Sequence, residues 1–194
     1  MSSAILPPAP TVPAASVATG DGRGRPERRV AETGVWIAIA TISMSFAALT
    51  SALVVRQSSG PDWQHLHLPS LLYVNTLVLL ASSMTLESSR RRGSFGLHAT
   101  LVLGMLFLGG QVFAWRQLAA QNLLLATGPS SAFFYVFTML HALHVLGGLG
   151  GLGYVERRLA AGVLSRTTFK AAALYWHFMA VLWLYLLALL TLRG

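Results

Sequence analysis

An uncharged apolar stretch over residues 132–154 limits the fold of this chain more than any other feature. The stretch contains no proline and no charged side chain. About 20 such residues, each rising about 1.5 Å, cross a hydrocarbon core of about 30 Å. The stretch therefore predicts a transmembrane helix.

Four further apolar runs of similar length divide the rest of the chain. They cover residues 34–55, 69–86, 95–115 and 171–192. With 54% hydrophobic and 10% charged residues, the chain carries far less charge than the roughly 25% of soluble domains. We predict an all-α, polytopic membrane protein in which residues 32–194 form one bundle of five transmembrane helices.

Residues 1–31 are rich in proline, alanine, serine and glycine and lack the apolar region of a signal peptide. They are predicted to form a disordered cytoplasmic arm. If the N-terminus lies inside, every basic residue except Arg56, Arg116 and Arg193 falls on the cytoplasmic side. The positive-inside rule therefore predicts a multi-pass protein of a bacterial inner membrane with its N-terminus inside. The net charge of +8 is explained by this asymmetry, and no nucleic acid is expected as a partner.

Two histidines lie within the apolar stretch. His141 and His144 are three residues apart, so they share one helix face, and at this depth an imidazole requires a protein partner. We expect both to face the interior of the bundle. Gly147 and Gly151 follow at the spacing of small residues that allows a neighbouring helix to approach closely.

The helical rise places other polar side chains at a similar depth. Counted from the cytoplasmic ends of their spans, Gln111, His141, Asn75 and His144 lie about 22, 21, 18 and 16 Å deep. Buried amides and imidazoles in membranes are commonly joined across helices by hydrogen bonds. The sequence predicts a structural polar layer made of these four residues.

A cofactor site in this chain is the weaker interpretation. The absence of cysteine excludes thiolate ligands, so a metal or haem would depend on histidine. His177 lies only about 8 to 9 Å from the inner surface, which does not match the depth of His141. His65 and His67, with Asp62 nearby, fall short of the ligands that metal sites require. No catalytic, cofactor-binding or metal residue is predicted.

Acidic residues are absent from the middle of every predicted span. Glu32, Glu87 and Glu156 all stand at span ends. A proton relay or ion-coupled transporter normally holds an ionisable carboxylate within the bilayer. Without one at depth, we expect no serine–histidine–acid set and no catalysis by this chain alone.

Several short motifs, taken in order, resemble subunit III of the haem–copper respiratory oxidases. The resemblance covers about residues 33–194 and is carried by Gly34, Val35 and Trp36; Leu68 and Pro69; Asn75, Thr76, Leu79, Leu80, Ser82 and Ser83; His141, Ala142, Leu143, His144, Val145 and Gly147; and Tyr175, Trp176, His177, Phe178 and Trp183.

This resemblance implies a non-catalytic, supporting subunit of a hetero-oligomeric, proton-translocating terminal oxidase. In that family the haems and copper belong to the catalytic subunit I, beside which subunit II also lies. The oxidase would reduce oxygen to water with electrons from cytochrome c. The chain is similar to the five-span form, and the family's association with membrane lipids implies that a phospholipid can be bound.

Three positions depart from the family pattern. Ile42, Ala114 and Ala180 stand where related chains carry acidic side chains. A role in proton uptake is therefore not implied for this chain. Three alternatives stay open at this point: a quinol oxidase subunit III, a homologue associated with nitric oxide reductase, and a free-standing histidine-ligated membrane cytochrome.

Overall fold

A computed structural model describes residues 24–60, 69–92, 94–121 and 128–193. These residues form five α-helices: α1 (Gly24–Ser59), α2 (Leu71–Arg92), α3 (Ser94–Ala120), α4 (Pro129–Ala160) and α5 (Arg166–Arg193). No strand occurs in this part of the chain. The predicted all-helical fold is confirmed.

Every helix contains a segment long and apolar enough to cross a membrane, from the 19 residues of Leu71–Ser89 to the 32 of Pro129–Ala160. Backbone N–H and C=O groups find no hydrogen-bonding partner in lipid, so a spanning segment satisfies them within its own helix. The described helices therefore supply the five predicted spans.

The first helix begins earlier than the predicted end of the arm. α1 starts at Gly24 and so includes residues 24–31, which the composition had assigned to the arm. The arginines and Glu32 near this boundary are good helix formers, so the helix continues from the span into them. Residues 1–23, like His65 and His67, lie outside the described residues, and the disorder of the arm stays a prediction.

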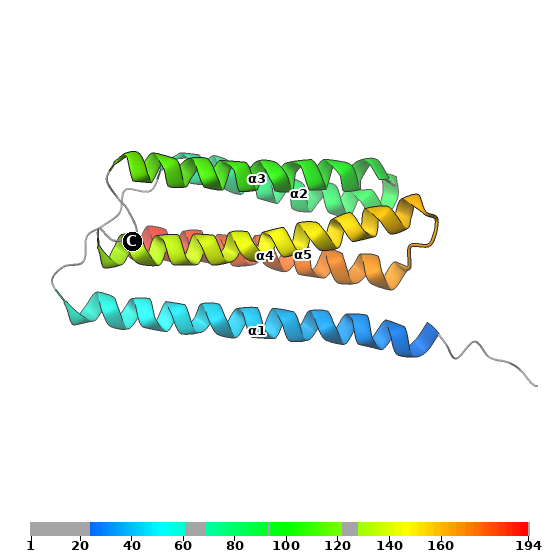
Figure 1. The fold of residues 1–194 in the computed structure, drawn as a ribbon, viewed down its shortest axis with the longest axis horizontal. Helices are drawn as coiled ribbons and strands as arrows, with labels where there is room; N and C mark the ends of the chain where they lie inside the picture. Colours follow the sequence, from blue (N-terminus) through cyan, green and yellow to red (C-terminus); the bar gives the residue numbers. More distant parts are fainter. Residues whose placement is uncertain (1–23, 61–68, 93, 122–127, 194) are drawn as a thin grey trace, which may run out of the picture.

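The helices are arranged as a ring of four with a fifth helix outside it. Within the ring, α2 packs against α3, α3 against α4 and α4 against α5, and α5 closes the ring on α2. Among the described residues, α1 packs only against α4 and α5. In Figure 1, α1 runs along one side of the molecule, α4 and α5 occupy the middle, and α2 and α3 form the far side.

Glycines hold α3 close to its neighbours. A Cβ atom on Gly96 would lie 2.7 Å from the Cα atom of Ser89 in α2, and one on Gly110 would collide with Asn75 Oδ1. Gly104 faces side chains of α4 and α5 at 2.7 Å in the same way. Since real Cβ atoms do not come this close to other atoms, these three positions have no room for a side chain.

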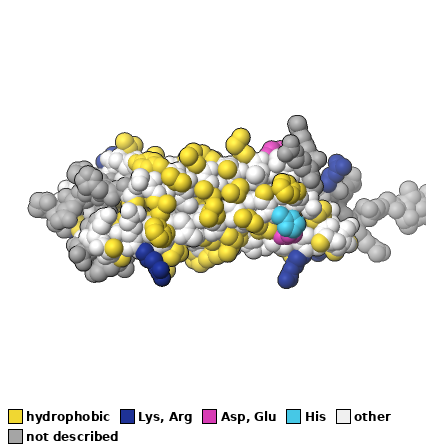
Figure 2. All heavy atoms as spheres, turned by 90° about the horizontal axis from the view of Figure 1, so that it is seen from above, with side chains coloured by type: hydrophobic (Ala, Val, Ile, Leu, Met, Phe, Trp, Pro, Cys, Tyr) yellow, Lys and Arg dark blue, Asp and Glu magenta, His cyan; other side chains and the backbone are white. Residues whose placement is uncertain are grey.

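The outer surface is largely apolar where it is exposed. Figure 2 shows hydrophobic side chains over the middle of one face, with lysine and arginine side chains away from the middle. An apolar belt between charged ends is the surface that a bilayer requires. The middle of this face therefore suits contact with lipid, and the charged side chains suit the polar regions at the ends of the bundle.

Candidate functional site

The polar layer predicted from depth is only partly joined by hydrogen bonds. Asn75 in α2 is 3% exposed and donates from Nδ2 to the backbone oxygen of Phe107 at 2.9 Å and to Gln111 Oε1 at 3.5 Å. These contacts tie α2 to α3 in the middle of the bundle. Gln111 Nε2 has no hydrogen-bonding partner in the described part of the chain.

His141 is fully buried among aromatic rings. Its ring centroid lies 5.1 Å from that of Trp183 and 6.0 Å from that of Phe107. Neither Nδ1 nor Nε2 has a hydrogen-bonding partner among the described residues. The sequence predicts that His141 faces inward, and it does, but its surroundings are aromatic rather than polar.

Gln111 and His141 nevertheless lie at the same level on facing helices. Trp115 Nε1 of α3 donates to Thr138 Oγ1 of α4 at 3.0 Å, and Gly104 of α3 faces Leu149 of α4. In an antiparallel pair, these two contacts place Gln111 beside the turn that holds His141. The depths estimated from the helical rise are therefore consistent with this register.

His144 lies on the edge of the bundle, toward α1. Its Nδ1 contacts the backbone oxygen of Leu140 at 2.7 Å, and its ring centroid is 6.0 Å from that of Phe46 in α1. The Tyr175 hydroxyl donates to the backbone oxygen of His144 at 3.1 Å. His144 thus belongs to the packing of α1, α4 and α5 rather than to the contacts of Asn75 and Gln111.

Two tryptophans form hydrogen bonds with hydroxyl groups across the ring. Trp183 Nε1 donates to Thr76 Oγ1 at 2.9 Å, and Trp176 Nε1 donates to Ser82 Oγ at 3.2 Å. Both bonds join α5 to α2. Sequence reasoning missed them, although Thr76 and Ser82 stood in the spans as polar groups that required a buried donor or acceptor.

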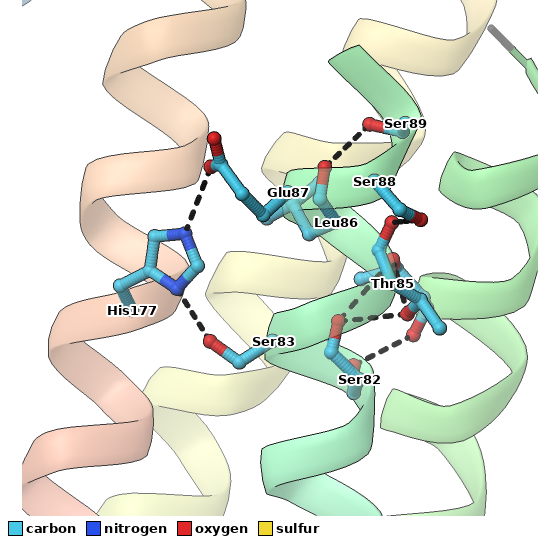
Figure 3. Close-up of polar contacts among 9 residues, drawn as sticks. Ser82, Ser83, Thr85, Leu86, Glu87, Ser88, Ser89 and His177 are labelled. Carbon is cyan, nitrogen blue, oxygen red and sulfur yellow. Dashed lines mark hydrogen bonds and ion pairs between the residues drawn. The ribbon is translucent and has the colours of Figure 1, made fainter. Parts of the chain in front are cut away.

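A serine–histidine–glutamate contact lies between α2 and α5, where none was expected (Figure 3). Ser83 Oγ is in hydrogen-bonding contact with His177 Nδ1, and Glu87 Oε2 lies 3.9 Å from His177 Nε2. Sequence reasoning did not anticipate this contact, although Ser83 and Glu87 are four residues apart and so lie on the one face of α2 that meets His177. That spacing was the available signal.

This contact does not have the geometry of an activated nucleophile. Such a nucleophile needs a base that an acid holds at about 2.6–3.2 Å, and the carboxylate of Glu87 is 3.9 Å from the ring. Both side chains are partly exposed, at 39% for His177 and 57% for Glu87. The arrangement is an ion pair when the imidazole is protonated.

The imidazole of His141 is packed between aromatic rings of α3 and α5. His141 is enclosed by Phe107 and Trp183, which occupy the space that a porphyrin would need beside the ring. Within the described residues, no three histidine, aspartate or glutamate side chains come together as a metal site requires.

The glycines of α4 divide into two groups. Gly148 is buried, and a Cβ atom there would lie 3.1 Å from the ring of Tyr175. Gly147 and Gly151 are exposed, and nothing lies within 4 Å of a Cβ atom on Gly151. The predicted close approach at Gly147 and Gly151 is thus wrong for contacts within the chain, since it falls on the adjacent face, at Gly148.

Other residues of the family motifs lie in different environments. Pro69 is buried at the start of α2, where its backbone oxygen accepts a bond from Leu72 N at 3.0 Å. Phe178 of α5 is half-buried against the core. Trp36 is 59% exposed on α1, as expected of an aromatic residue near a membrane interface.

The positions without the family's acidic residues are buried and apolar. Ile42 is 6%, Ala114 0% and Ala180 4% exposed. Ala180 lies one turn before Trp183, on the face of α5 that meets His141. A small apolar side chain therefore occupies this buried position of α5.

We predict that His141→Phe preserves or raises the thermal midpoint for loss of this subunit from its complex. The substitution keeps an aromatic ring between Phe107 and Trp183 and removes two unpaired nitrogens, each of which costs about 1–3 kcal/mol when buried without a partner. Thr138→Val is the control because it removes a hydroxyl that is bonded to Trp115, and it should lower the midpoint. A larger fall for His141→Phe than for Thr138→Val would contradict the prediction.

Comparisons with known proteins agree on one family. The family model described as "Cytochrome c oxidase subunit III" matches residues 35–193, which include all five predicted spans almost entirely. A cytochrome c oxidase subunit 3 of Synechocystis sp. is 32% identical, over 87% of this chain and 77% of that protein. The corresponding proteins of Thermostichus vulcanus and Bacillus subtilis are 28% and 26% identical over 90% and 83% of this chain, and 92% and 85% of their own lengths.

The match extends over the whole bundle rather than over one motif. It begins in the first span, includes the histidine helix and ends in the last turn of α5. The matched residues thus include the five helices that are long and apolar enough to cross a membrane. The chain is therefore a multi-pass membrane protein that belongs to the cytochrome c oxidase subunit III family.

Proposed function

We propose that this chain is a non-catalytic supporting subunit of a proton-translocating haem–copper terminal oxidase that takes electrons from cytochrome c. The observation that carries the proposal is the family match over residues 35–193. The ring of helices supports it, because its centre is filled by tryptophans, phenylalanines and leucines. Haem and copper belong to the catalytic subunit I, which this chain and subunit II accompany.

The charges support an orientation with the N-terminus inside a bacterial plasma membrane. The turns after α2 and α4 lie at the same end of the bundle as the start of α1 (Figure 1). Arg90, Arg91 and Arg92 are in the first of these regions, and Arg157 and Arg158 are in the second. Positive charge on one side is the arrangement that the positive-inside rule assigns to the cytoplasm.

Purification of the chain in mild detergent tests this function. We expect it to co-purify with a subunit that carries haem and copper and with a second oxidase subunit. The complex should consume oxygen with reduced cytochrome c, and the isolated chain should show no Soret band. Oxygen consumption with a quinol alone would identify a quinol oxidase, and a Soret band in the isolated chain would overturn the supporting role.

We also propose that a phospholipid binds beside this subunit, in the groove between α1, α4 and α5. The groove has a volume of about 400 Å³, and small residues line much of it: Gly34, Ala38, Gly147, Gly151, Ala171 and Ala172. Tyr154 and Thr168 line it near one end. A wall made largely of glycine and alanine leaves room for an acyl chain.

Arg158 supplies a charge for the head group. Its guanidinium lies 5.2 Å from the centroid of the Tyr154 ring, and its Nε donates to the Tyr154 hydroxyl at 2.9 Å. These contacts hold the cation next to a residue that lines the groove. An anionic phosphate is the head group that such an arrangement favours.

We predict that Arg158→Gln lowers the amount of anionic phospholipid retained by the purified complex by about tenfold, as expected for the loss of one charge-assisted hydrogen bond. Quantitative lipid mass spectrometry measures it. Arg157→Gln is the control, since Arg157 lines a different depression on α4. Equal lipid loss in both variants would indicate a general charge effect and would count against this site.

A further inference from the structure

The ring of four helices is hollow at the end that carries the α4–α5 connection. A pocket of about 430 Å³ lies there and is lined by Ser89, Leu97, Leu159, Leu164, Phe169, Arg166 and Lys170. All four ring helices and the connection contribute to its wall. Pockets for small molecules measure about 300–1,000 Å³, so this one has the volume of a ligand site.

The interior of this end pocket is apolar. Leu97 is buried, and Leu159, Leu164 and Phe169 are half-buried around it. The Ser89 hydroxyl already donates to the backbone oxygen of Leu86 at 2.6 Å, so its proton is not available to a ligand. The wall therefore favours a hydrocarbon chain.

Two cations stand at the pocket. Arg166 and Lys170 lie four residues apart in the first turns of α5, so they share one face of the helix. Neither side chain has a hydrogen bond or ion pair with another described residue. The first turn of α5 contains no acidic residue. Like charges at this spacing repel each other, and the positive end of the α5 dipole adds to them. A bound anion would relieve this repulsion.

The pocket lies at the ends of the membrane spans. The candidate spans of α3, α4 and α5 begin or end at Ser94, Ala160 and Arg166, each within three residues of a residue that lines the pocket. This is the boundary between hydrocarbon and head groups. A ligand here has its charged end in the polar layer and its apolar end between the helices.

We propose that the end pocket binds one long-chain fatty acid, with its carboxylate at Arg166 and Lys170 and its chain between Leu97, Leu159 and Phe169. A guanidinium pairs with a carboxylate through two parallel hydrogen bonds. The 430 Å³ volume equals about 14 water molecules at about 30 Å³ each, and a methylene group is of similar size. The pocket therefore has room for one acyl chain between the helices.

Photolabelling of the purified oxidase complex tests this proposal. The probe is a long-chain fatty acid with a diazirine near its methyl end, and mass spectrometry maps the adducts. We expect adducts on Leu97, Leu159 or Phe169. The double variant Arg166→Gln/Lys170→Gln should reduce them at least about tenfold, because it removes the charge-assisted hydrogen bonds.

The controls test separately whether the labelling depends on these two cations, on the open pocket and on the carboxylate of the ligand. Arg158→Gln changes a cation beside the other groove and should leave the labelling unchanged. Leu164→Trp fills the pocket while both cations remain, and it should also reduce the labelling. Arg166 and Lys170 are exposed, so their replacement leaves the core intact. An unlabelled fatty acid should displace the probe, and the fatty alcohol of the same length should not.

Three results would overturn the proposal. The first is labelling that persists unchanged in the double variant. The second is labelling spread over outward-facing residues such as Val102 and Met105, which are 67% and 60% exposed. The third is displacement by phosphatidylglycerol as effective as that by the fatty acid, which would identify a phospholipid site. Each of them is read from the adducts and is independent of the electron donor and of oxidase activity.

Discussion

Replacing Gly110 by leucine is expected to remove this subunit from the purified oxidase complex. Gly110 faces Asn75, whose Cγ atom would lie 2.9 Å from an added Cβ atom. Asn75 cannot move aside without losing its bonds to Phe107 and Gln111. Overpacking of this kind costs about 1–3 kcal/mol or more, and each lost hydrogen bond adds about 1 kcal/mol. A loss of about 3 kcal/mol corresponds to a more than tenfold fall in retained subunit.

The neighbouring glycine provides the control for this experiment. Gly109 is exposed, and nothing lies within 4 Å of a Cβ atom added to it. Gly109→Leu should therefore leave the ratio of this subunit to the catalytic subunit unchanged, as measured by quantitative mass spectrometry. If Gly110→Leu and Gly109→Leu assemble equally well, the close contact of α2 and α3 is not needed for assembly.

The second large effect is expected from Trp183→Ala. Trp183 is 1% exposed, and its ring centroid lies 5.1 Å from those of Phe107 and His141. Its Nε1 donates to Thr76 Oγ1. Lipid is as apolar as the bundle interior, so the loss here is one of packing rather than of hydrophobic transfer. Substitution of a buried tryptophan by alanine typically costs about 3–5 kcal/mol, and the thermal midpoint should fall accordingly.

One further variant separates the contribution of the ring from that of the hydrogen bond, and a second is a control at an exposed tryptophan. Trp183→Phe keeps an aromatic ring and loses the bond to Thr76, so a decrease of about 1 kcal/mol is expected. Trp36→Ala removes a tryptophan that is 59% exposed and should change the midpoint little. A midpoint for Trp183→Ala as high as that for Trp36→Ala would show that the centre of the ring does not stabilise the bundle.

The helices could be predicted because lipid leaves the backbone few alternatives. An uncharged stretch such as residues 132–154 must satisfy its own peptide groups, so its length and composition give a helix directly. The positions of His141 and Gln111 at one level also follow from the helical rise. Both predictions depend on properties of single helices, which a sequence contains.

The contacts between helices were harder to predict because they depend on rotation about each helix axis. A rotation of about 100° separates Gly147 from Gly148. An added Cβ atom would lie 3.1 Å from the Tyr175 ring at Gly148 but 3.9 Å from the Tyr175 hydroxyl at Gly147, so the rotation decides which glycine is closely packed. The contact of Ser83, His177 and Glu87 was unexpected for the same kind of reason, because it depends on how α2 and α5 are rotated about their axes. The surroundings of His141 also depend on other helices, since the rings next to it belong to Phe107 of α3 and Trp183 of α5.

The position of α1 outside the ring sets a constraint on biogenesis. Helices leave the ribosome in chain order, so α1 enters the membrane before α2, α3, α4 and α5. Its buried side chains, Ile42, Phe46 and Leu53, face α4 and α5, which are synthesised last. α2 and α3 can pack against each other as soon as both are inserted. α1 stays surrounded by lipid until α4 and α5 are inserted, and exposure of its apolar face to lipid costs little free energy. Of the five helices, α1 is therefore synthesised first, but it is among the last to be packed into the bundle.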